Sequence, residues 1–182
     1  MPFYLYDPPQ RFVAGAVGQP GERTFYLQAT DGSRVTSVSL EKFQVSQLAE
    51  RLDELLDEVL RRTGGQPATL SAPADDGPLD LPLMEEFRVG AIALAWDGET
   101  DRVVIEAQEE SETPVEPLAD VVPTDGPGVL RVRLTPEAAR AFAQRALRIV
   151  AQGRPPCPLC GLPLDTTGHV CPRQNGYRAG HD

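Results

Sequence analysis

The first half of the chain contains three short apolar stretches followed by a longer one with helical spacing. The short stretches carry many β-branched and aromatic residues and are separated by Pro-Gly and Asp-Gly turn sequences, which favours strands. In the longer stretch the apolar residues recur every three or four positions, so that they share one face of a helix. The pattern therefore predicts strands over 12–18, 24–30 and 34–40, and a helix over 41–62.

The second half repeats this order of elements. Its apolar stretches predict strands over 87–96, 102–108 and 129–134, and then a helix that ends at Gly153. Thr135 can cap this helix through its side-chain oxygen. The proline that follows fits the first helical turn, because no backbone N–H is needed there.

The two halves also match in sequence, which suggests related units. FVAGAV at 12–17 is similar to FRVGAI at 87–92. We therefore predict an α+β fold built from two ββ-β-α units, about 10–65 and 85–153, related by duplication or by convergent packing. Their antiparallel sheet or sheets would be covered by the two helices, and the whole domain would span 1–153.

Two polar segments separate the predicted elements. The linker 66–84 is rich in proline, alanine and aspartate, and the loop 109–128 is acidic and proline-rich. Such a composition buries little apolar surface, so we expect the loop to be dispensable for stability. Gln28 and Glu106 occupy matching places on two predicted strands. They could line a pocket, but an outward-facing position is the simpler interpretation.

Length and charge limit the functions that fit this chain. It has 182 residues and a formal net charge of −10, which argues against nucleic acid or an anionic membrane as partner, because both need a basic face. The N-terminus has no signal-peptide pattern, and the longest apolar run, 89–96, is too short to span a bilayer. Three cysteines grouped at metal-binding spacing suit a reducing compartment. We expect a cytoplasmic protein.

The segment 154–182 carries the strongest chemical motif of the sequence. It contains all three cysteines and both histidines. Cys157 and Cys160 are separated by two residues, which lets two thiolates bind one ion from a tight turn. Together with His169 and Cys171 they form a Cys3His set, and zinc prefers four such ligands in a tetrahedron. We therefore predict one Zn²⁺ site in a zinc-knuckle-like tail, with a structural role because no coordination position is left open.

Alternatives to this zinc site stay open at the level of sequence. His181 could replace His169 as the fourth ligand. The C-x2-C pair could instead be a thioredoxin-like redox pair, although that pair opens a helix and two prolines precede Cys157 here. The three cysteines could also be unrelated residues of a frayed tail.

Elsewhere the sequence lacks the usual catalytic motifs. We find no G-x-S-x-G elbow and no phosphate-binding glycine loop, and acidic pairs such as Asp75-Asp76 are interpreted as solvated charge. We therefore favour a non-enzymatic binding or adaptor protein. Its zinc-stabilised tail would present Arg173, Asn175 and Tyr177 to a protein partner.

Two other functions are compatible with the sequence. The chain could be an enzyme or receptor with a pocket between the two units, for example for a phosphorylated ligand. Arg11, Arg88 or Arg102 would then have to converge on that pocket. A second alternative is a thiol redox or metal-handling protein that uses the tail.

Three stretches of the sequence resemble one family. They are similar to an uncharacterised, conserved-hypothetical family of high-GC Gram-positive bacteria, a domain of unknown function. The stretches are YLYDPPQRFVAGAVGQPGERTFYLQA, SVSLEKFQVSQLAERLDELLDE and the ending CPLCG…GHVCPR. The resemblance covers nearly the whole chain and implies no activity. It does imply partners, because family members are often encoded beside a histidine-phosphatase-like protein and a phosphoinositide-kinase-like protein.

Overall fold

The computed structural model describes residues 2–64, 74–153, 156–162, 164 and 169–173. All six predicted strands and both predicted helices are present in this part of the chain, with ends within two residues of those expected. A short strand near the N-terminus was not predicted. The elements are β1 (Phe3–Tyr6), β2 (Arg11–Val17), β3 (Thr24–Asp31), β4 (Arg34–Leu40), α1 (Lys42–Thr63), β5 (Glu85–Asp97), β6 (Arg102–Glu109), β7 (Val129–Leu134) and α2 (Pro136–Ala151).

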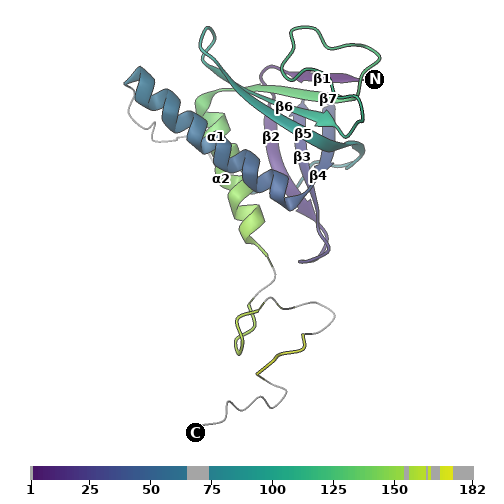
Figure 1. The fold of residues 1–182 in the computed structure, drawn as a ribbon, viewed down its shortest axis with the longest axis vertical. Helices are drawn as coiled ribbons and strands as arrows, with labels where there is room; N and C mark the ends of the chain where they lie inside the picture. Colours follow the sequence, from purple (N-terminus) through teal and green to yellow (C-terminus); the bar gives the residue numbers. More distant parts are fainter. Residues whose placement is uncertain (1, 65–73, 154–155, 163, 165–168, 174–182) are drawn as a thin grey trace.

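The described strands form one mixed sheet in the order β1-β7-β6-β5-β4-β3-β2 (Figure 1). Within each half the three strands pair antiparallel, as expected of consecutive hairpins. The halves join where β4 and β5 pair in parallel, and β1 lies parallel to β7 at one edge. The predicted α+β class with two ββ-β-α units is confirmed, and the two parallel pairings are additions to it.

Both helices pack on the same face of the sheet. Thr135 caps α2 as predicted, since its Oγ1 accepts from the N–H of Ala138 at 3.2 Å. α2 lies against β2, and α1 lies against β5, so each helix contacts a strand of the other unit. The rings of Phe12 on β2 and Phe142 on α2 stack with centroids 4.6 Å apart. Because each helix packs on a strand of the other unit, the two units share one hydrophobic core.

The sheet is strongly bent, so that strands far apart in its order meet. Tyr6 at the end of β1 is fully buried, and its hydroxyl lies 2.8 Å from Oγ1 of Thr36 on β4. Three strands separate β1 from β4 in the sheet order. The two side chains can therefore meet only if the sheet bends toward the helix-covered side.

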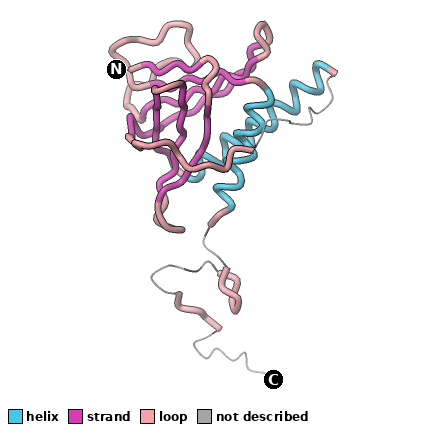
Figure 2. Tube along the Cα trace, turned by 180° about the vertical axis from the view of Figure 1, so that it is seen from behind, coloured by secondary structure: helices cyan, strands magenta, loops and turns pink. Residues whose placement is uncertain are grey.

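Two loops cover the opposite face of the sheet, where Figure 2 shows loop segments crossing the strands. Residues 74–84 cross the first unit. The Oε1 atom of Gln28 accepts from the N–H of Asp80 at 2.7 Å, and its Nε2 donates to the carbonyl of the same residue at 3.0 Å. Leu79 packs where Gly15 has no side chain, because a Cβ there would lie 2.6 Å from Leu79 atoms. Gln28 is thus buried beneath a loop and does not face solvent.

The acidic loop covers the second unit in a similar way. Glu106 is 1% exposed, and one of its carboxylate oxygens accepts from the N–H of Leu118 at 3.0 Å. Arg131 donates to the other carboxylate oxygen at 2.8 Å and to the carbonyl of Ala119 at 2.8 Å. Glu106 therefore points away from the helix-covered face, as the outward-facing interpretation expected, but the loop covers it and excludes it from solvent. The expectation that the loop is dispensable is revised as well, because the loop satisfies a buried carboxylate.

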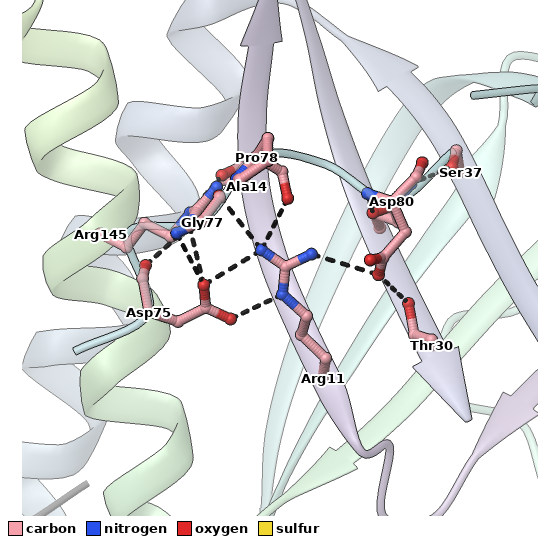
Figure 3. Close-up of polar contacts among 10 residues, drawn as sticks. Arg11, Ala14, Thr30, Ser37, Asp75, Gly77, Pro78, Asp80 and Arg145 are labelled. Carbon is pink, nitrogen blue, oxygen red and sulfur yellow. Dashed lines mark hydrogen bonds and ion pairs between the residues drawn. The ribbon is translucent and has the colours of Figure 1, made fainter. Parts of the chain in front are cut away.

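Residues 74–80, which we call the strap, pass around the edge strand β2 (Figure 3). Asp75 accepts from Nε of Arg11 at 2.6 Å and from Nη1 of Arg145 at 3.2 Å. Arg145, which is 5% exposed, also donates to the carbonyl of Ala14 on the outer edge of β2 at 2.8 Å. Asp76 pairs with Arg148. Asp75, which sequence alone assigned to solvated charge, therefore fastens the strap along the edge strand β2, whereas the pair of Asp76 is solvent-exposed.

Asp75→Ala is expected to destabilise the fold by about 1–3 kcal/mol. The change leaves the buried Arg145 without its carboxylate. The cost is expected to stay below the roughly 3–5 kcal/mol of a fully buried pair because Asp75 is itself partly exposed. Denaturant unfolding measures the loss. Asp76→Ala is the matched control and should cost less than about 0.5 kcal/mol, since its pair with Arg148 is exposed. Equal effects of the two substitutions would contradict a fastening role.

The same contact predicts how the stability of the strap depends on pH. The hydrogen bond from Arg11 holds the pKa of Asp75 below its usual value. A carboxyl with a lowered pKa in the folded state stabilises the fold above the pKa of the unfolded chain, about 3.9. This contribution is lost as the pH falls from there through the lowered folded pKa, so the difference between wild type and Asp75→Ala should shrink on acidification.

Candidate metal centre

The predicted metal ligands lie in the part of the tail that follows α2, apart from the sheet and helices (Figure 1). Residues 156–162 form a tight turn. The N–H of Gly161 donates to the carbonyl of Cys157 at 2.8 Å, and the N–H of Cys157 donates to the carbonyl of Leu162 at 2.8 Å. Gly161 has a φ of +74°, a conformation that a side chain would strain. This turn brings Cys157 and Cys160 to one side of the chain.

The four predicted ligands come together in one cluster. One ligand atom from each of Cys157, Cys160, His169 and Cys171 lies within 4.8 Å of all the others. The Sγ atoms of Cys157 and Cys171 are 3.9 Å apart, and Sγ of Cys160 lies 3.2 Å from Nε2 of His169. A tetrahedron with metal–sulfur bonds of about 2.3 Å has sulfur–sulfur edges of about 3.8 Å. The cluster could therefore hold a metal ion.

The thiols are free and differ in their surroundings. All three cysteines lack a disulfide, and the 3.9 Å between Cys157 and Cys171 is far longer than the roughly 2.05 Å of a sulfur–sulfur bond. Hydrogen bonds from the backbone of Cys160 and then Leu159 lower the pKa of the Cys157 thiol to about 6. Burial raises the pKa of the Cys160 thiol. Of these two thiols, Cys157 is therefore the one that more readily forms a thiolate, the form that binds metal.

A comparison with protein families agrees with the resemblance noted from the sequence. The profile of a family described as "Protein of unknown function (DUF3090)" matches residues 4–171. The chain belongs to the DUF3090 family. The DUF3090 match begins in β1 and ends at Cys171, so it includes the sheet, both helices and all four residues of the cluster. No curated protein sequence and no solved structure matches the chain.

Other residues that the sequence singled out for binding do not form a second site. Arg11 is held by the strap, and Arg88 pairs with Glu41. Arg102 lines a cavity of about 470 Å³ near the β5–β6 turn, at the end of β5 remote from Arg88. These three arginines therefore do not converge on one cavity. Arg173 is exposed beside the cluster, and Asn175, Tyr177 and His181 lie outside the described residues.

The burial of Arg145 was also not anticipated. Arg145 lies on the apolar face of α2 beside Phe142 and Ala146, where sequence periodicity leads one to expect an apolar side chain. A charged residue within an apolar helix face is rarely buried unless it is paired, so this arginine could have indicated a buried polar partner. In the described part of the chain, neither helix is long and apolar enough to cross a membrane.

Proposed function

We propose that the DUF3090 chain binds one zinc ion through Cys157, Cys160, His169 and Cys171. The observation that carries this proposal is that the four ligand atoms all lie within 4.8 Å of one another. Thiolate and imidazole are the ligands that zinc prefers in proteins, and Cys3His is one of its common structural sets. Among soft-ligand metals, zinc also suits a tetrahedral arrangement without imposing redox chemistry.

The zinc ion would have a structural role. Four protein ligands fill a tetrahedron, so no position is left at which a metal-bound water could be activated. The described tail contains short turns and no helix or strand longer than a single bridge, so it has little core of its own. Metal binding would supply the free energy that orders such a segment. The sheet and helices, by contrast, have an extensive apolar core that includes none of the four ligand residues.

We further propose that the protein acts by binding other proteins rather than as an enzyme. One support is the closed ligand set. Another is that a pocket for an anionic ligand would need several arginines together, whereas Arg11 and Arg88 are paired with carboxylates and Arg102 lies at a separate cavity. A metal-folded tail with an exposed Arg173 could contribute a contact surface. The neighbours implied by the family resemblance are the first partners to test, in the cytoplasm.

The wild-type protein is expected to purify with about one zinc per chain, because the cluster offers one tetrahedral set. Elemental analysis of protein purified without chelator measures this content. Replacement of the metal by Co²⁺ then reports the ligands, since tetrahedral thiolate coordination gives strong visible absorption and a sulfur-to-cobalt charge-transfer band. A metal-free protein, or a cobalt spectrum without thiolate bands, would refute the zinc proposal.

A further inference from the structure

Strand β5 lies in the middle of the sheet order, yet much of its length has a neighbour on one side only. β4 pairs with β5 at two positions, Ser37 with Glu85 and Ser39 with Arg88. From 91 to 97, β5 pairs with β6 alone, and among the described residues no other backbone group bonds to this stretch. Successive peptide groups of a strand point to alternate sides. About half of the N–H and C=O groups of 91–97 therefore face away from β6 along a free edge.

A groove follows this free edge and is lined by residues of β5 and α1. Its volume is about 630 Å³. Ile92 and Leu94 point to the helix-covered face, where they pair with β6 residues of the core, whereas Ala93 points to the opposite face beside Glu106. All three line the groove, so it runs along the backbone edge and not over one face of the sheet. The α1 side of the groove includes Phe43, Gln44, Arg51 and Leu55.

One end of the groove shows that this edge accepts hydrogen bonds from outside the sheet. Nε2 of Gln44 donates to the carbonyl of Val89 at 3.2 Å, just beyond the last pairing with β4. Here a side chain of α1 does what a neighbouring strand would do. Farther along, from 91 to 96, no side chain of a described residue bonds to the backbone.

The side chains of the groove define the chemistry that would fit it. Phe43 is 66% exposed, and Leu55, Ile92 and Leu94 are partly exposed, so apolar surface is open along the groove. Arg51 is exposed on the same wall and forms no ion pair with a described residue. A strand edge beside a helix, with apolar contacts and one cation, is suited to an extended peptide that carries apolar side chains and a carboxylate.

We propose that this groove binds an extended segment of a partner protein, which adds a strand to the free edge of β5. The segment would place apolar side chains at alternate positions against α1 and β5, and a carboxylate at Arg51. This inference gives a site to the binding role proposed above and rests on that role. It does not depend on zinc, because the groove lies on the sheet and α1, and it can fail while the metal proposal holds.

The first test selects peptides and asks where they bind. The full-length protein is used to select short linear peptides from a phage-displayed random library, and fluorescence anisotropy measures the affinity of each synthetic peptide. Arg51→Glu should weaken binding by about tenfold or more, because it replaces an attractive charge by a repulsive one. Arg61→Glu is the matched control, an exposed arginine of the same helix outside the groove, and should leave the affinity within about twofold.

The second test distinguishes strand addition from contact with side chains alone. Each residue of the selected peptide is replaced in turn by its N-methyl form, which removes one backbone donor. If the peptide pairs with β5, sensitivity should alternate along the peptide, because every second N–H points to the edge. Amide hydrogen exchange at 91–97 should also slow when the peptide is bound.

Three results would overturn the proposal. The first is a library that yields no peptide sensitive to Arg51→Glu, and the second is an N-methyl scan without alternation, as a small-molecule pocket or a side-chain contact would give. The third is self-association of the protein that Arg51→Glu or Phe43→Ala abolishes, since a second copy would then occupy the groove. Analytical ultracentrifugation without peptide detects that case.

Discussion

Cys160→Ser is expected to abolish stable zinc binding while the sheet and helices stay folded. A serine hydroxyl is a far weaker zinc ligand than a thiolate, and the turn that holds Cys157 would keep only one of its two sulfurs. We expect the affinity for zinc to fall by more than about 100-fold, beyond the effect of losing a residue that only supports a ligand. Competition with a chromogenic chelator measures this loss.

Matched variants separate the loss of a ligand from damage to the turn. Leu159→Ser introduces the same residue next to Cys160 but removes no ligand, so it should retain about one zinc per chain. His169→Ala should also weaken binding strongly, because Nε2 of His169 belongs to the cluster. His181→Ala should not. A zinc content that survives Cys160→Ser, or that needs His181, would contradict the ligand set.

Removal of zinc should affect the tail and spare the domain. The core comprises residues of the strands and of both helices, and no cysteine belongs to it. A chelator should therefore increase proteolysis beyond Gly153 while far-UV circular dichroism changes little. If the thermal unfolding of the whole chain shifts instead, then the tail is part of the cooperative domain. Whether residues 1–153 form a domain apart from the tail is a prediction that this experiment tests.

The elements of the fold could be predicted because each has a local signature. Period-two and period-3.6 patterns set the strands and helices, and Thr135 marked the start of α2. The pairing of β4 with β5 could not be predicted in this way, because it joins Ser37 and Ser39 to residues beyond α1 and the linker. β1 was missed because four residues give too short a pattern, and its partner β7 is remote in sequence.

The candidate metal cluster could be predicted because ligand type and spacing are themselves chemical information. The C-x2-C turn and the nearby His169 and Cys171 specify a set of donors without any knowledge of tertiary structure. The free edge of β5 could not be anticipated, since it arises where β4 gives way to α1 beside a strand from the other half of the chain. Whether a strand edge is free depends on which strands pair and over what length, and not on the composition of the strand.

The predictions based on composition failed for the loops. Proline and acidic residues predicted segments without structure, but Gln28 and Glu106 at matching strand positions are buried beneath them. The useful signal was the polar residue itself, set among apolar neighbours on a central strand. A buried amide or carboxylate must be satisfied, and in both halves a loop backbone provides a partner.

Glu106→Ala is expected to cost about 3–5 kcal/mol of unfolding free energy, a large part of the roughly 5–15 kcal/mol of a typical domain. The substitution leaves Arg131, whose side chain is 15% exposed, without its carboxylate. It also leaves the side-chain amide of Gln108 and the N–H of Leu118 without an acceptor. Denaturant unfolding gives the loss, and faster amide exchange at Leu118 would show that the loop detaches.

Three further variants locate the origin of this cost. Glu112→Ala, in the same loop and exposed, should change stability by less than about 0.5 kcal/mol. Glu106→Gln should give an intermediate loss, because an amide oxygen can still accept from Leu118 but cannot pair with Arg131. If an unpaired Arg131 is the main cost, Glu106→Leu combined with Arg131→Met should be less destabilising than the sum of the two single changes, as expected when both members of a buried pair are removed. Additive effects would instead assign the cost to the loop contacts alone.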